Sequence, residues 1–165
     1  MSAKIKAHLK KLLAQEKGAV VREWGARWPV ALVYPHIYPV AMGNLGFQVI
    51  YRLLNAQPSL VCERAFLPGP QEWEEHRRTR TPILTLESQR PLTDCGAVAF
   101  SISFEGDYPQ VLQILEAGQI PLLAAARGPG DPLVLAARRR YNAAFDNRRK
   151  HGFSARHRSE TLGLG

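Results

Sequence analysis

Short apolar runs alternate with amphipathic stretches along most of this chain. Such runs are typical of parallel strands that helices cover on both faces of a sheet. We therefore expect five strands, over Pro29–Tyr34, Leu60–Phe66, Ile83–Leu86, Ala97–Ser103 and Pro132–Ala136. Because these runs are apolar on both faces, we expect the core to contain Val30, Leu32, Val98, Phe100 and Leu133.

The stretches between the runs carry apolar residues at helical spacing. Residues 3–16 place their leucines and an isoleucine on one face, with Gly18 as the predicted end of that helix. Asn44 is a predicted N-cap of a second helix. Pro70 opens a third, and a fourth is expected to be capped by Asp107 and closed at Gly118.

Alternating strands and helices predict an α/β fold. We expect a doubly wound, mainly parallel five-stranded sheet of the Rossmann or flavodoxin-like type. Three parts are predicted: an N-terminal amphipathic helix over residues 1–18, an α/β domain over 19–137, and a basic C-terminal tail over 138–165.

The tail differs in composition from the rest of the chain. Residues 138–165 hold eight Lys or Arg against two Asp or Glu, so they carry +6 of the total net charge of +8. With two leucines and no valine or isoleucine, the tail is expected to be disordered, or to derive from a shifted reading frame. An alternative is nucleic-acid binding through Arg138–Arg140 and Arg148–Lys150.

Composition and motifs exclude several other classes. No apolar run approaches the roughly 20 residues of a membrane span, and no signal peptide is visible, so a cytoplasmic protein is expected. Cys62 and Cys95 are expected to be reduced thiols and not metal ligands. No phosphate-binding loop, nucleophile elbow or metal motif is present, so no catalytic residue is predicted; a small α/β enzyme of unknown chemistry stays an alternative.

The predicted sheet itself suggests where a ligand would bind. In open α/β sheets ligands lie outside the carboxyl ends of the strands, near the point where the strand order reverses. The loops at that edge are rich in aromatic and small residues. The candidate cofactor-binding residues are Tyr34, His36, Tyr38, Met42, Gly43, Asn44, Gly46, Ser101, Ser103 and Glu105.

Several of these residues belong to motifs of a known family. The chain runs through Y-P-x-x-Y-x-x-x-M-x-N-L-G, then E-R, L-E-S and F-S-x-x-x-E, in that order, between about residues 5 and 136. These motifs begin at Tyr34, Glu63, Leu86 and Phe100. In this respect the chain closely resembles the N-terminal cobalamin-binding-like domain of a family of bacterial radical SAM proteins.

The resemblance implies a cobalamin-binding-like accessory domain that works with a radical SAM catalytic domain. In the family the last strand leads to a G-G turn and a C-x-x-x-C-x-x-C motif, whose thiolates hold a [4Fe–4S] cluster. Here Ala137 and Arg138 follow the strand and the cysteine motif never appears, so the chain alone is expected to be inactive and to hold no Fe–S cluster. Around His36 the D-x-H-x-x-G motif of many cobalamin domains is absent too, so cobalamin is expected to bind without a protein ligand or not at all. Because the G-G turn is missing, any such binding is expected to be weak.

Overall fold

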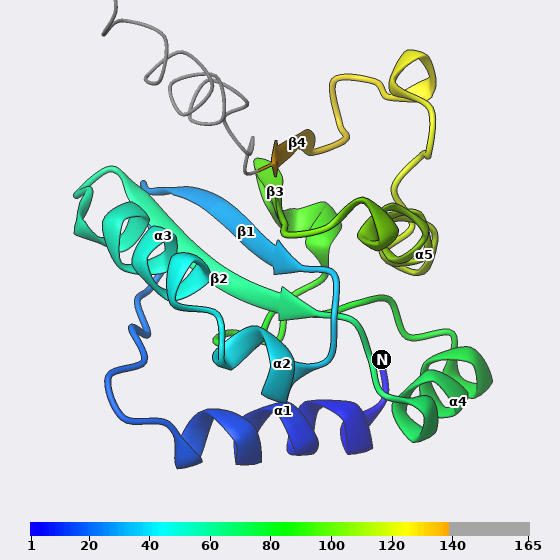
Figure 1. The fold of residues 1–165 in the computed structure, drawn as a ribbon, viewed down its shortest axis with the longest axis horizontal. Helices are drawn as coiled ribbons and strands as arrows, with labels where there is room; N and C mark the ends of the chain where they lie inside the picture. Colours follow the sequence, from blue (N-terminus) through cyan, green and yellow to red (C-terminus); the bar gives the residue numbers. More distant parts are fainter. Residues whose placement is uncertain (139–165) are drawn as a thin grey trace, which may run out of the picture.

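The computed structural model describes residues 1–138, whose centre is one parallel sheet (Figure 1). Its strands are β1 (Trp28–Tyr34), β2 (Leu60–Phe66), β3 (Ala97–Ile102) and β4 (Leu133–Arg138). They lie in the order β2-β1-β3-β4, and all three neighbouring pairs are parallel. The expectation of an α/β fold with a parallel sheet is therefore confirmed.

Helices and short turns connect the strands. They are α1 (Ala3–Gln15), α2 (Tyr38–Met42), α3 (Leu45–Ala56), α4 (Pro70–Thr79) and α5 (Tyr108–Ala117), with 3₁₀ turns η1 (Leu92–Asp94), η2 (Glu105–Asp107) and η3 (Ala124–Ala126). The predicted cap of α3 is confirmed, because the Asn44 side chain accepts a hydrogen bond from the backbone N–H of Phe47. Gly118 ends α5 as predicted.

The sheet separates two apolar clusters, because side chains alternate between its faces. On one face Val33, Val98 and Phe100 pack with α5. On the other, Leu32 and Cys62 pack beneath α3, whose Phe47 is fully buried. Figure 1 shows α3 lying over β1 and β2, with α5 beyond β3.

The fifth strand, expected over Ile83–Leu86, does not form. Leu86 donates its N–H to the Arg64 carbonyl, whereas Thr85 donates to Arg90 within its own loop. Leu84 makes a single antiparallel bridge to Pro91. The segment is apolar because it is buried, with Ile83 in the same apolar cluster as α5, and not because it is a strand of the sheet. The described residues thus contain a four-stranded sheet.

Leu133 is the one wrong member of the predicted core. Val30, Leu32, Val98 and Phe100 are buried, whereas Leu133 is 54% exposed. Leu133 and Ala97 are partners in the sheet, so both side chains lie on the face that α3 covers elsewhere. No helix of the described residues covers β4 on that face.

Two predicted helix signals act differently from expectation. Asp107 occupies the N-cap position of α5 as predicted, but its side chain makes no capping bond; its carboxylate accepts hydrogen bonds from the N–H groups of Ser103 and Phe104. The first helix ends at Gln15, before Gly18, which follows with a φ of 85°. The Asp107 side chain and Gly18 therefore shape the loops beside these two helices.

The expectations for the basic tail lie outside the described residues, apart from the backbone of Arg138 at the end of β4. Within residues 1–138, no helix combines the length and the apolar character needed to cross a bilayer.

Candidate functional site

Three of the predicted site residues meet at the carboxyl ends of β1 and β3. The hydroxyls of Tyr34 and Ser103 are hydrogen-bonded at 3.0 Å, and the Asn44 amide donates to both, at 3.1 and 3.3 Å. The chain leaves β1 for β2 on one side and later returns to β3 on the other side. This cluster therefore occupies the switch point, the position predicted for a ligand.

The cluster is held rigidly by its surroundings. Asn44 is also the N-cap of α3, so its carbonyl oxygen is fixed by the Phe47 N–H while its amide reaches Tyr34 and Ser103. The Tyr34 ring is buried and makes an edge-to-face contact with Phe47, at 5.4 Å between centroids. Tyr34 and Phe47 thus fill the space between β1 and α3.

Tyr38 and Met42, from the same loop, turn toward β2 instead. The Tyr38 hydroxyl donates to Glu16 at 2.8 Å, and its ring packs edge-on against Phe66. The Met42 sulfur accepts from the Arg64 guanidinium and from Gln48. Burial, followed by the bond to Glu16, raises the pKa of Tyr38 to about 12, so its hydroxyl stays protonated.

The remaining predicted residues line the outer rim. His36 is exposed, and its Nδ1 accepts a hydrogen bond from the N–H of Ile37. Gly43 ends α2, and Gly46 is exposed in the first turn of α3. Ser101 is half-buried on β3. Glu105 begins η2 at the surface.

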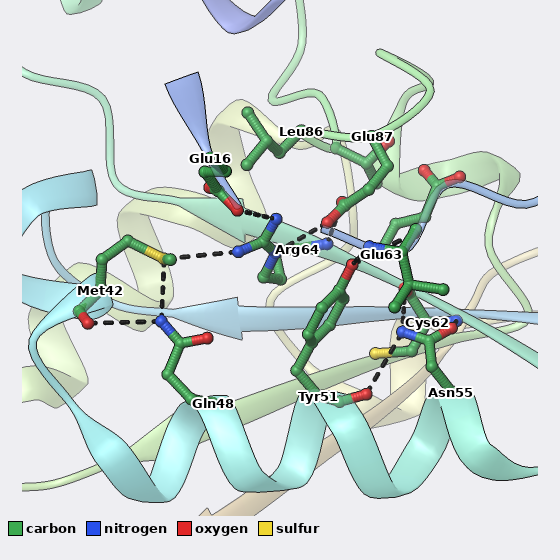
Figure 2. A network of polar contacts seen from close by, with 12 residues as sticks. Glu16, Met42, Gln48, Tyr51, Asn55, Cys62, Glu63, Arg64, Leu86 and Glu87 are labelled. Carbon is green, nitrogen blue, oxygen red and sulfur yellow. Dashed lines mark hydrogen bonds and ion pairs between the residues drawn. The ribbon is translucent and has the colours of Figure 1, made fainter. Parts of the chain in front are cut away.

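A buried ion network stands directly behind this rim, on β2. Arg64 is 1% exposed and donates from Nε to the Glu87 carboxylate at 2.7 Å and from Nη2 to Glu16 at 2.8 Å. A second Glu87 oxygen accepts the backbone N–H of Arg64. In Figure 2 the guanidinium lies between Glu16, Glu87 and Met42, above the α3 side chains of Tyr51 and Gln48. The network joins three segments distant in sequence.

The attraction between the opposite charges of this network offsets part of the cost of removing them from water. Burial acts to lower the pKa of Arg64 and raises that of Glu87. Attraction to Glu87 and the bonds from Glu16 and Glu87 nevertheless hold the pKa of Arg64 above its ordinary value. The guanidinium also lies 4.4 Å from the centroid of the Tyr51 ring, a cation–π contact. All three nitrogens of the Arg64 guanidinium make hydrogen bonds within the protein, which indicates a structural role.

A family model described as "Radical SAM proteins, N-terminal" matches residues 46–143. The match spans more than half of the 165 residues and includes α3, β2, β3 and β4. This chain belongs to that family. Searches of the curated proteins and of the solved structures give no match.

The ion network of this radical SAM N-terminal domain was not predicted as a site. Its sequence signal is Glu63-Arg64, two charged residues inside a strand that is otherwise apolar and buried. Charges almost never lie in such a position unless they are paired. The partners Glu16 and Glu87 could not be named from sequence, because nothing local links them to residue 64.

The two cysteines of the domain lie apart and are unreactive by environment. Cys62 packs under α3 and Cys95 belongs to the cluster on the opposite face of the sheet. Both are free thiols. Burial raises the pKa of Cys95 to about 12 and that of Cys62 higher still above its ordinary value. Within the described residues no three His, Cys, Asp or Glu side chains gather as a metal site.

The rim is open but has no slot for the nucleotide tail of cobalamin, the cofactor that the family resemblance implies. A corrin whose nucleotide tail inserts between β1 and α3 does not fit. Tyr34 and Phe47 occupy the space between these two elements, and Asn44 lies across its entrance. The rim itself is open. At Gly106 in η2, an added Cβ would have no neighbouring atom within 4 Å.

Proposed function

We propose that this chain is a non-catalytic accessory domain that docks onto the catalytic unit of a radical SAM protein. Membership of the radical SAM N-terminal family supports the association. The observation that carries the docking is a half of the sheet that no helix of residues 1–138 covers. We call it the open face: Trp28, Leu133 and Leu135, on the side where α3 covers β1 and β2.

The open face is apolar and continuous. Trp28, Leu133 and Leu135 are 47%, 54% and 46% exposed. Trp28 lies against Gly96, where an added Cβ would stand 2.1 Å from the indole nitrogen, and the Leu133 N–H bonds to the Gly96 carbonyl. Parallel sheets normally have both faces covered, so a bare half is a surface that another unit completes.

Ligand counting supports the proposal that this chain does not cleave S-adenosylmethionine. A [4Fe–4S] cluster of this class needs three thiolates close together, and this chain has Cys62 and Cys95 on opposite faces of the sheet. Anaerobic reconstitution of the purified chain with iron and sulfide should leave no stable cluster and no cleavage of S-adenosylmethionine. One cluster bound per chain would overturn this part of the proposal.

The finer part of the proposal concerns cobalamin. We place a corrin flat across the rim formed by the loop from His36 to Gly46 together with Glu105 and Gly106, with no inserted tail. Contacts on a single face give weak binding, because little of the ligand is buried. Absorbance titration with hydroxocobalamin should therefore yield a dissociation constant in the micromolar range or weaker.

A matched pair of variants tests this placement. Gly106 and Gly128 both have open space around an added Cβ, but Gly128 lies in the connection between α5 and β4, before the start of β4. Gly106→Trp should abolish hydroxocobalamin binding and Gly128→Trp should leave it unchanged. Equal binding by both variants would contradict the rim as the corrin site, without affecting the docking proposal.

A further inference from the structure

A second concavity lies away from the rim, between α1 and α4. It is a cavity of about 210 Å³ lined mainly by apolar side chains. Ile5 and Leu9 of α1 form one wall, and Phe66, Leu67 and Leu84 form much of the other. Apolar cavities of roughly 150 Å³ are known to bind benzene, so this volume suits one ring or two fused rings.

His76 of α4 supplies a polar group in this apolar lining. The side chain is 7% exposed and its Nδ1 lies 2.8 Å from the Thr81 carbonyl. A carbonyl only accepts, so Nδ1 carries the proton, and in the neutral ring Nε2 is an acceptor. Nε2 has no hydrogen-bond partner within residues 1–138. No fully enclosed side-chain nitrogen or oxygen of these residues lacks a partner, so Nε2 keeps some accessible surface, and His76 lines the cavity.

The His76 ring is also held in place. The Thr81 bond fixes one edge, and Trp73 makes an edge contact with it at 6.3 Å between centroids. At the cavity lining, Glu72 accepts from the Gly69 N–H and pairs with His8 at 2.6 Å. Glu75, a second lining carboxylate, is bonded to Ser2 and Arg78. Both lining carboxylates already have partners, and Lys4 also lines the cavity, so no unpaired carboxylate favours a charged ligand and a neutral one fits best.

We propose that this cavity binds a small, neutral, aromatic molecule that carries one N–H or O–H group. Its ring would lie between α1 and the segment after β2, and its donor would bond to Nε2 of His76. The cavity meets the segment from His36 to Gly46 at Tyr38 alone and does not include the open face, and its ligand is argued from His76, so it does not rest on the proposed function.

The test compares two probes of similar size, 4-fluorophenol and 4-fluorotoluene, by ¹⁹F NMR titration of the full chain. The cavity should bind both, and the phenol roughly five- to tenfold more tightly, the usual contribution of one hydrogen bond. His76→Phe keeps the ring and removes the acceptor. It should bring the phenol to the affinity of the toluene and leave the toluene unchanged.

A second pair of variants separates occupancy from folding. Leu9→Trp should fill the cavity and abolish binding of both probes, whereas Ala14→Trp, at an exposed position of α1 outside the cavity lining, should not. Circular dichroism and the thermal midpoint check that each variant is folded. Failure of both probes to bind the wild-type chain at millimolar concentration would overturn the proposal. So would a phenol preference that persists in His76→Phe, or binding retained in Leu9→Trp.

Discussion

On the side of α3, the two halves of the sheet differ in whether other side chains cover them. Over β1 and β2, Phe47 and Tyr51 of α3 complete a dry core, and Arg64 is tied to Glu16 and Glu87. Over β3 and β4 the leucines of the outer strand face solvent. The same type of strand is therefore core in one half and surface in the other, because within residues 1–138 a helix lies above one half and not above the other.

The largest expected effect is on the half of the sheet that α3 covers, which we call the closed half. Arg64→Met removes the only cation of the buried network and leaves Glu87 without its partner. Such changes cost about 3–5 kcal/mol. Urea unfolding should show this loss, whereas Arg52→Met, at an exposed position of α3, should change the free energy of unfolding by less than about 0.5 kcal/mol. A loss below 1 kcal/mol for Arg64→Met, on the order of a surface change, would mean that the network is not structural.

A matched pair of leucines compares the halves directly. Leu32→Ala in the closed half should destabilise the domain by about 2–5 kcal/mol, because it leaves a cavity under α3. Leu135→Ala on the open face should cost less than about 1 kcal/mol, because that side chain is already half in water. Equal losses in urea unfolding would show that the open face is covered in the isolated chain.

The sequence allowed much of the closed half to be predicted, and little of its long-range detail. Four of the five strands, the Asn44 cap and the meeting of Tyr34 with Ser103 follow from local patterns and from the rule for switch points. An apolar run shows that a segment is suited to burial, but not what covers it. Local patterns therefore predict a core position for Leu133 and a strand at Ile83–Leu86, and both predictions are wrong.

Local sequence patterns also do not predict which side chains from distant segments pair with one another. Met42 was expected at the rim, yet its sulfur faces Arg64. The cavity at His76 arises only when α1 packs beside α4, so no spacing within either helix indicates it.

The smallest predicted effect lies where α1 begins beside α4. The bond from Ser2, and then the bond from Arg78, hold the pKa of Glu75 below its ordinary value. A lowered folded-state pKa adds stability above the unfolded-state value, about 4.3, which is lost as pH falls through the folded-state value. The thermal midpoint of the wild-type chain should thus exceed that of Glu75→Gln at pH 7, and the difference should shrink by pH 3. A constant difference would contradict this role.

We propose that the open face receives a radical SAM catalytic unit. Hydrogen–deuterium exchange of this chain, alone and with the separately expressed catalytic unit of a family member, tests this docking. We predict slower exchange in β3 and β4 on mixing, abolished by Leu135→Lys and retained in Leu53→Lys, which alters an exposed leucine of α3. Unchanged exchange in β3 and β4, or loss of the effect in Leu53→Lys alone, would contradict the claim.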